Sequence, residues 1–224
     1  MLRDALLDAL ALVLPVECAG CGAPDRSLCA GCLAALRGTP GRHLLADATP
    51  VVCALDYAGP VRQSILALKE NGRTDVARAL SVPLALAMTE ALAGVPAGTA
   101  SVEVLPVPTS RSAYRRRGYD PVALLLRRAG VRPVTELAHT RRATQQKHLA
   151  VDERASNRAG ALRARRKLAG RRFLLVDDVL TTGATLAEAA RAVNAAGGEI
   201  AAAATLAYTQ KRAQHPDVRS LNVS

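Results

Sequence analysis

Aromatic side chains are scarce in this 224-residue chain, which has four tyrosines, one phenylalanine (Phe173) and no tryptophan. Proteins that bind single-stranded nucleic acid by base stacking need several aromatic rings, and this chain has few side chains from which to form such a stacking surface. Long apolar runs are also missing, because no segment after the first fifteen residues has about 18 consecutive apolar residues without a charge. The sequence therefore predicts no membrane span, and we expect a soluble, cytoplasmic protein.

The first fifteen residues, MLRDALLDALALVLP, are apolar enough to suggest a signal peptide. Asp4 and Asp8 interrupt the apolar run, and no small-residue cleavage site follows an uninterrupted apolar core. We therefore expect an amphipathic docking helix over residues 3–14 rather than a signal peptide.

Two common nucleotide-binding loops are absent as well. The chain contains neither the Walker pattern G-x-x-x-x-G-K-[ST] nor a G-x-G-x-x-G after its first strand. Positive charge is nevertheless plentiful, with a net charge of +11 and 18 Lys or Arg residues against four acids between Arg111 and Arg172. Such density predicts a field that attracts phosphorylated ligands or nucleic acid. The ordinary alternative is a solvated, arginine-rich surface.

Four of the five cysteines form the sequence CAGCGAPDRSLCAGC, two C-x-x-C pairs separated by seven residues. This spacing is typical of a tetrahedral zinc site, and four thiolates leave no open coordination position, so we expect structural Zn²⁺. Disulfides are the alternative, less expected in a cytoplasmic chain. Cys53 is read as a buried strand residue. The four predicted metal ligands are Cys18, Cys21, Cys29 and Cys32.

Periodicity and turn residues divide the chain into two segments. Residues 1–50 are predicted to contain the N-terminal helix, the zinc knuckle and a linker from 33 to about 50, and residues 51–224 an α/β domain. Strands alternate with helices in the second segment, which predicts a mostly parallel sheet flanked by helices, with ligands at the carboxyl ends of the strands. The expected strands are 51–57, 101–108, 171–178 and 199–208, and the expected helices 60–72, 75–94, 119–130 and 183–198.

The stretch RRFLLVDDVLTTGATL places two aspartates at the end of a predicted strand and a hydroxyl-rich turn directly behind them. Adjacent carboxylates repel each other unless hydroxyls, Mg²⁺ or basic groups satisfy them, and a sugar diol is a suitable partner. Backbone amides and threonine hydroxyls at a helix start can surround a phosphate. The pattern therefore predicts a ribose 5-phosphate site, although a strand followed by a capped helix would be the ordinary explanation of a shorter match. The residues concerned are Asp177, Asp178, Thr181, Thr182, Gly183, Ala184 and Thr185.

The segment LLVDDVLTTGATL resembles the 5-phosphoribosyl 1-diphosphate (PRPP) motif of type I phosphoribosyltransferases. Four further blocks precede it: the four-cysteine knuckle, YAGPVRQSILALKENG, VLPVPTSRSAYRRRGYD and TRRATQQKHLAVDERASNRAGAL. The order of all five blocks is similar to that of the ComF family, the competence protein F-like phosphoribosyltransferase homologues, over nearly the whole chain.

The resemblance implies a type I phosphoribosyltransferase-like core and a role for each block. Asp177 and Asp178 would hold the ribose as catalytic residues, the turn Thr181–Thr185 would bind the 5-phosphate, and catalytic Mg²⁺ would bridge diphosphate and ribose oxygens. PVPTSR corresponds to the pyrophosphate loop, and several cations could neutralise the diphosphate, although each could equally be a solvated surface residue. The implied diphosphate-binding residues are Thr109, Ser110, Arg111, Lys69, Arg115, Arg117 and Arg141, and the implied hood residues are Gln145, Arg154 and Asn157.

The chain departs from the family pattern at one point, since RGYDP stands where the family commonly has RGFNQ, so the amide pair of that motif is missing at Asp120 and Pro121. Two functions remain open. One is phosphoribosyl transfer between PRPP and a nitrogenous base. The other is a non-catalytic accessory role in single-stranded DNA uptake or competence, in which fold and basic surface bind nucleic acid, a nucleotide or the DNA-uptake machinery. A homodimer is also compatible with the resemblance.

Overall fold

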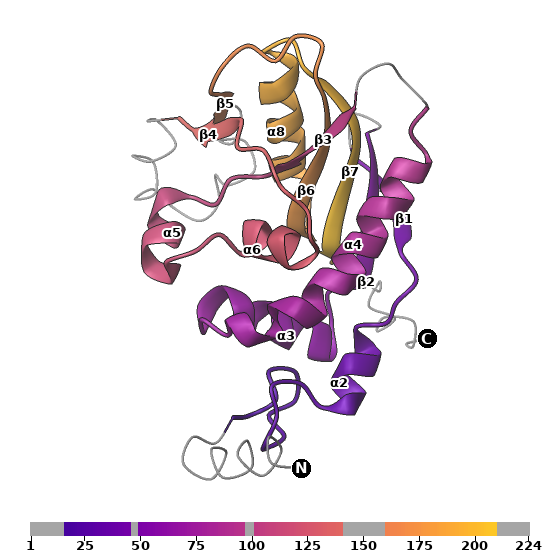
Figure 1. Ribbon diagram of the computed structural model, residues 1–224, viewed down its shortest axis with the longest axis vertical. Helices are drawn as coiled ribbons and strands as arrows, with labels where there is room; N and C mark the ends of the chain where they lie inside the picture. Colours follow the sequence, from indigo (N-terminus) through magenta and orange to yellow (C-terminus); the bar gives the residue numbers. More distant parts are fainter. Residues whose placement is uncertain (1–15, 46–48, 97–100, 141–159, 210–224) are drawn as a thin grey trace, which may run out of the picture.

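The computed structural model describes residues 16–45, 49–96, 101–140 and 160–209, so the helix predicted over 3–14 lies outside the described residues. A five-stranded sheet with the order β1-β2-β7-β6-β3 forms the centre of the molecule (Figure 1). Four of its strands are parallel, and β1 pairs antiparallel with β2 at one edge. The mostly parallel sheet predicted from the sequence is therefore confirmed. The strands are β1 (Gly41–Leu44), β2 (Pro50–Asp56), β3 (Val102–Pro106), β6 (Arg172–Leu180) and β7 (Glu199–Tyr208).

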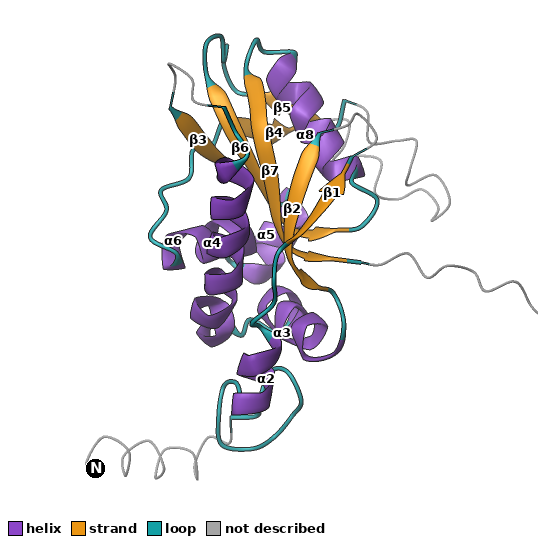
Figure 2. Ribbon diagram, turned by 90° about the vertical axis from the view of Figure 1, so that its right-hand side faces the viewer, coloured by secondary structure: helices purple, strands orange, loops and turns teal. Residues whose placement is uncertain are grey.

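Helices cover both faces of this sheet (Figure 2). One face packs against α3 (Gly59–Glu70), α4 (Ala77–Ala93) and α6 (Pro121–Arg128), and the other against α8 (Ala184–Asn194). The alternation along β6 divides the two cores, because Leu174 and Val176 belong to the first and Phe173 and Leu175 to the second. Short helices complete the described set: α2 (Ala30–Ala35), the 3₁₀ turn η1 (Thr74–Val76) and α5 (Arg111–Arg117).

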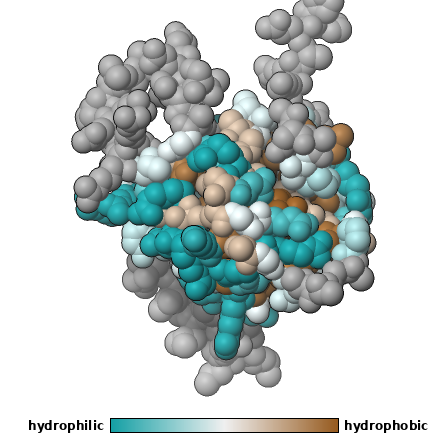
Figure 3. All heavy atoms as spheres, turned by 90° about the horizontal axis from the view of Figure 1, so that it is seen from above, coloured by the Kyte–Doolittle hydropathy of each residue, from teal (hydrophilic) through white to brown (hydrophobic). Residues whose placement is uncertain are grey.

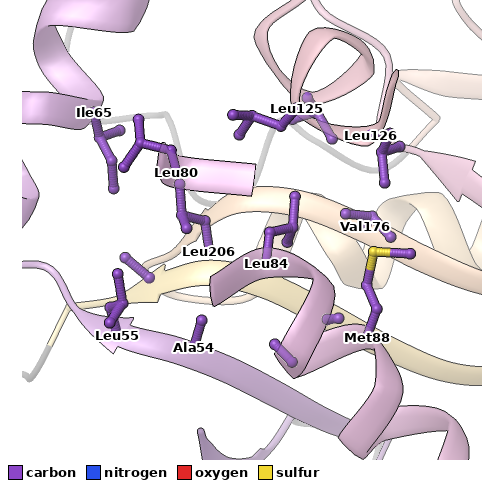
Figure 4. Packing of buried hydrophobic residues seen from close by; sticks show 14 of the residues in the cluster. Ala54, Leu55, Ile65, Leu80, Leu84, Met88, Leu125, Leu126, Val176 and Leu206 are labelled. Atoms are coloured by element: carbon purple, nitrogen blue, oxygen red, sulfur yellow. The ribbon is translucent and has the colours of Figure 1, made fainter. Parts of the chain in front are cut away.

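Helix α4 is the main support of the larger core (Figure 4). Leu80 and Leu84 are fully buried, and Met88 lies beside Leu126 and Val176. Among the described residues, only the segment Thr74–Ala93 is long and apolar enough to cross a membrane, with a mean hydropathy of 1.4, and half of it is buried in the protein. Contacts with β2, β7 and α6 account for the buried half of this segment.

Several of the predicted boundaries need correction. The helix expected over 183–198 ends at Asn194, and the strand expected over 101–108 ends at Pro106. The linker expected from 33 to about 50 contains the end of α2 and the strand β1, whose four residues are stabilised by pairing with β2, a contact that local sequence does not reveal. The strand expected to end at Asp178 continues to Leu180, because β7 continues to pair with it as far as Tyr208. The carboxylate pair therefore lies within β6, just beyond Val176, where the pairing with β3 ends.

A second, two-stranded sheet is not part of the first, but its residues Leu137 and Leu162 belong to the core that α8 covers. Strands β4 (Leu137–His139) and β5 (Leu162–Ala164) pair antiparallel. In the sequence, β4 precedes and β5 follows residues 141–159, which include the predicted hood residues and lie outside the described part of the chain.

Candidate functional site

The two adjacent carboxylates lie on opposite faces of β6, as strand alternation requires. Asp178 faces α3, where its carboxylate oxygen forms an ion pair with Lys69 Nζ at 2.9 Å. Both side chains are largely buried, with exposed fractions of 17% for Asp178 and 25% for Lys69. Asp177 accepts a hydrogen bond from the Asp178 backbone N–H at 2.8 Å. The structure thus brings Lys69, one of the predicted cations, directly to the carboxylate pair from a segment more than a hundred residues away.

The ionisation of Asp177 is unfavourable in this environment. Burial and, after it, the charge of Asp178 raise the pKa of the Asp177 carboxyl well above its usual range, and these effects outweigh the backbone hydrogen bond and the charge of Lys69. A carboxyl in this state gains from any ligand that brings positive charge or hydroxyl donors to it. Such a perturbed group beside a cation is typical of a binding or catalytic site.

The turn behind the carboxylates needs glycine at its centre. Gly183 has φ +78°, and a Cβ at this position would lie 2.5 Å from Leu45 Cδ2. The carbonyl of Gly183 accepts the first helical hydrogen bond of α8, from Ala187 N at 2.9 Å, so the turn leads straight into the helix. Thr181 and Thr182 are exposed beside this helix start. Exposed hydroxyls at a helix N-terminus form an arrangement suited to a phosphate group.

The predicted pyrophosphate loop, Pro106–Arg111, lies beside the carboxylate pair. Val107 N donates to Val176 O at 2.9 Å, which extends the contact between β3 and β6 to the residue before Asp177. Asp120 then holds the loop from the other side, since its Oδ2 accepts from Thr109 N at 3.2 Å while its Oδ1 caps α6 through Ala123 N at 2.9 Å. The carboxylate at the position where this chain departs from the family pattern therefore has a structural partner.

The predicted arginines divide into two groups. Arg117 is largely buried and donates from Nη2 to Glu70 Oε1 at 2.7 Å, while its Nε is a buried donor without a hydrogen-bond partner among the described residues. Arg111 and Arg115 are exposed on α5, the helix that begins directly after the pyrophosphate loop. Arg141 lies outside the described residues. The structure therefore joins Arg117 to the residue next to Lys69 and leaves Arg111 and Arg115 accessible.

Three residues at this site carry contacts that the motif comparison did not predict. Besides Asp120, His139 of β4 has its Nε2 2.9 Å from Pro108 O, and the Tyr119 hydroxyl donates to Leu68 O near the end of α3. The sequence held a signal for Asp120, because an Asp before Pro121 is a common helix start. No local pattern could have indicated the contacts of His139 and Tyr119, since both depend on how distant segments pack.

The four knuckle cysteines converge on one point. Their sulfur atoms all lie within 4.8 Å of one another, and the Sγ atoms of Cys21 and Cys29 are 3.6 Å apart. Tetrahedral coordination with Zn–S bonds of about 2.3 Å places sulfurs about 3.8 Å apart, so the cluster fits a metal ion such as zinc. Gly20 allows the close packing, because a Cβ there would lie 2.6 Å from Cys32 Sγ.

Backbone hydrogen bonds favour the thiolate form at two of the four cysteines, Cys18 and Cys29, whereas the pKa values of Cys21 and Cys32 are raised. Burial favours the neutral thiol of Cys18, but hydrogen bonds from the backbone of Cys29, Gly20 and Cys21 outweigh it and lower its pKa to about 6. The amide of Cys29 lies 3.3 Å from Cys18 Sγ and that of Cys32 lies 3.5 Å from Cys29 Sγ. Cys53, by contrast, is buried in β2 at a distance in sequence from the cluster, as predicted, and burial raises its pKa to about 11.

A sheet of this order, with a carboxylate pair on one strand and a glycine-centred turn leading into the next helix, defines the class of type I phosphoribosyltransferase domains. Residues 115–223 match the family described as phosphoribosyl transferase domain. The DNA utilization protein YhgH of Escherichia coli O6:H1 is 30% identical over 198 residues, which cover 78% of this chain and 81% of that protein. YhgH of Escherichia coli K12 is 29% identical over 191 residues, 75% of this chain and 78% of that protein. The chain belongs to the ComF family of phosphoribosyltransferase-like proteins.

Proposed function

We propose that this chain binds PRPP with Mg²⁺ at the carboxyl ends of β3 and β6 and transfers phosphoribosyl to or from a nitrogenous base. The observation that carries the proposal is the pair Asp177 and Asp178, placed between the turn Thr181–Thr185 and the loop that Val107 N joins to β6 at 2.9 Å. Ribose hydroxyls, a 5-phosphate and a diphosphate each find the chemistry they require within this one region.

The transfer itself breaks the C1–O bond to the diphosphate and forms a C1–N bond to the base. The diphosphate leaves with several negative charges, so cations close to the leaving oxygens lower the barrier. Mg²⁺, when bound, would neutralise diphosphate and ribose oxygens in this way. Among the residues of the chain, Arg111, Arg115 and Lys69 are our candidates for the same task.

The ion pair between Lys69 and Asp178 would keep both side chains in place until the ligand binds. The lysine charge stabilises the Asp178 carboxylate while no sugar is bound, and a ribose diol can then replace it as the partner. Lys69 would become available to the diphosphate in the same event. Both groups are thus held near their working positions before the ligand arrives.

A non-catalytic role in DNA handling is the second candidate. The relatives from Escherichia coli and Shigella flexneri carry the name DNA utilization protein, and the segment from Arg111 to Arg172 is strongly basic. In this case the fold would bind a nucleotide, single-stranded DNA or a component of the uptake machinery without turnover. Binding through the basic surface would weaken steeply as salt rises, whereas PRPP binding should depend on Mg²⁺ and on the two aspartates.

Calorimetric titration of PRPP into zinc-loaded protein, with and without Mg²⁺, tests the first proposal. We expect saturable binding in the presence of Mg²⁺, lost in Asp177→Asn/Asp178→Asn and kept in the control Asp25→Asn/Glu199→Gln, which removes the same charge elsewhere. Diphosphate release with a panel of bases then tests turnover. Absence of PRPP binding under every condition would refute the transferase proposal and favour the accessory role.

A further inference from the structure

A surface hollow of about 290 Å³ is lined by β5, by the residues that follow it and by the last turns of α8. Both elements lie in the upper part of Figure 1. Its position separates it from the PRPP motif, because α8 starts at the motif and the hollow begins seven residues later, about 10 Å along the helix axis. Four of its lining residues are cationic and the others are alanines and one leucine. The cations are Arg163, Arg166, Lys167 and Arg191.

A buried carboxylate fixes the guanidinium of Arg191. Its Nε and Nη2 donate to Glu188 Oε2 and Oε1 at 2.7 and 2.8 Å, and Nη2 also donates to Leu162 O at 2.9 Å. Glu188 is only 7% exposed, so this clamp is part of the core packing of α8. Within the described ranges, Nη1 of Arg191 makes no hydrogen bond, and its two N–H donors remain for a ligand.

Arg166 is held in the same manner by a second buried carboxylate. Its Nε donates to Glu136 Oε2 at 3.0 Å and its Nη2 to Glu136 Oε1 at 2.5 Å, while Glu136 is 6% exposed. Nη1 of Arg166 again has no partner in the part of the chain that the structure describes. Two arginines with fixed planes and unused donors, on the wall of one hollow, are preorganised for an oxyanion.

The other two cations have no carboxylate to neutralise them. Arg163 and Lys167 are exposed, and neither forms an ion pair with another described residue. Together with Arg166 and Arg191 they place four positive charges around one hollow. Only two carboxylates, Glu136 and Glu188, pair with these four cations among the described residues. An excess of like charge at one place is unfavourable unless an anion compensates it.

The walls of the hollow are anchored by backbone hydrogen bonds. Leu168 N donates to Ala196 O at 2.8 Å, and Arg165 N donates to Glu136 O at 2.7 Å. The face seen from this end carries many hydrophilic residues, with apolar ones between them (Figure 3). The described segments therefore form the hollow without any rearrangement.

We propose that this hollow is a second anion site, which binds the phosphate groups of a phosphate ester or polyphosphate independently of the PRPP motif. Arg166 and Arg191 donate in-plane hydrogen bonds to phosphate oxygens, and Arg163 and Lys167 supply the unneutralised charge. Stabilisation of the negative C-terminus of α8 would explain Arg191 alone. It does not explain Arg163, which belongs to β5, or Lys167, which follows that strand.

The test uses the full chain, zinc-loaded, without added Mg²⁺. Inorganic diphosphate and a fluorescent single-stranded oligonucleotide, dT12, are titrated into wild type, Arg163→Ala/Lys167→Ala, Arg163→Lys/Lys167→Arg and the control Arg62→Ala/Arg78→Ala, which removes two exposed cations elsewhere. The same titrations in Asp177→Asn/Asp178→Asn separate the hollow from the PRPP motif. Thermal denaturation of each variant checks that it folds.

We expect the alanine pair in the hollow to raise the Kd for diphosphate by about tenfold or more, and the charge-conserving pair to stay near wild type. Diphosphate binding should survive in Asp177→Asn/Asp178→Asn, so that this result stands whether or not the PRPP proposal holds. An equal loss with dT12 identifies a phosphodiester backbone as the ligand source, and loss with diphosphate alone identifies a small phosphate compound. Alanine variants indistinguishable from the control, or binding abolished by the aspartate variants, would overturn the proposal.

Discussion

At the scale of single residues, the site keeps a carboxyl group where the fold disfavours its charge. Burial and the neighbouring Asp178 raise the pKa of Asp177 to about 8, from an ordinary value of 3.8. The neutral form is therefore favoured by the folded state, and the stability associated with it is complete below about pH 4 and is lost as pH rises toward 8. A ligand that supplies hydroxyl donors or a cation stabilises the ionised Asp177 carboxylate, so the stability lost at high pH is regained when such a ligand binds.

The replacement Asp177→Asn should accordingly stabilise the protein without ligand. We expect its Tm to exceed that of wild type by several degrees at pH 8, corresponding to on the order of 2 kcal/mol, and by less at pH 5. Thermal denaturation over this pH range measures the difference. Glu199→Gln, which removes an exposed carboxylate, serves as the control, and a Tm difference for Asp177→Asn that does not change with pH would contradict the assignment.

At the scale of elements, one side chain joins the pyrophosphate loop to α6. Asp120 accepts from Thr109 N with one oxygen and from Ala123 N with the other, so the loop and the helix start share a single carboxylate. Tyr119, the residue before Asp120, donates a hydrogen bond from its hydroxyl to Leu68 O near the end of α3, the helix that carries Lys69. Tyr119 and Asp120 thus fix the pyrophosphate loop, the start of α6 and the end of α3 relative to one another.

The replacement Asp120→Asn should separate these two roles. Asparagine is an equally good helix cap, and its carbonyl can still accept from Ala123 N, but its NH₂ group cannot accept from Thr109 N. We expect a stability loss of at most about 1 kcal/mol, with faster hydrogen exchange at the Thr109 amide and unchanged exchange at Ala123. Asp120→Ala should accelerate exchange at both amides. Equal acceleration at both positions in the asparagine variant would show that the carboxylate does not act on the loop separately.

At the scale of the whole molecule, the four-cysteine knuckle lies against α3, one of the helices on the first face of the sheet. Arg73 Nη1 donates to Glu17 O at 2.9 Å, and a Cβ on Gly20 would lie 3.3 Å from Pro60 Cβ at the start of α3. Ala19 and Leu28 pack against the larger core. The knuckle is therefore continuous with the domain, yet the two core clusters are formed almost wholly by residues outside it.

Metal removal should consequently act on one part of the molecule. We expect one zinc per chain by elemental analysis, lost in Cys29→Ser/Cys32→Ser and retained in Cys53→Ser. Chelation should accelerate hydrogen exchange in residues 16–36 and at the start of α3, while β6 and β7 stay protected. Loss of protection throughout the sheet would instead show that the whole fold depends on the metal.

Features that depend on neighbouring residues could be predicted from the sequence alone. The strand β7 is found at its predicted bounds, and the cysteine cluster and the turn around Gly183 follow from local spacing and from glycine chemistry. The order of the five blocks along the chain also indicated the family. These patterns are readable because each motif contains, within about fifteen residues, all the groups that it requires.

Contacts between distant segments became visible only in the folded protein. The fold brought Lys69 to Asp178, Leu45 to Gly183 and Asp120 to Thr109. It also showed that four residues of an apparent linker form β1, since short strands are stabilised by pairing rather than by propensity. The physical reason is common to all of them: ion pairs, close packing and sheet pairing depend on separation in space, which a linear pattern of residues does not contain.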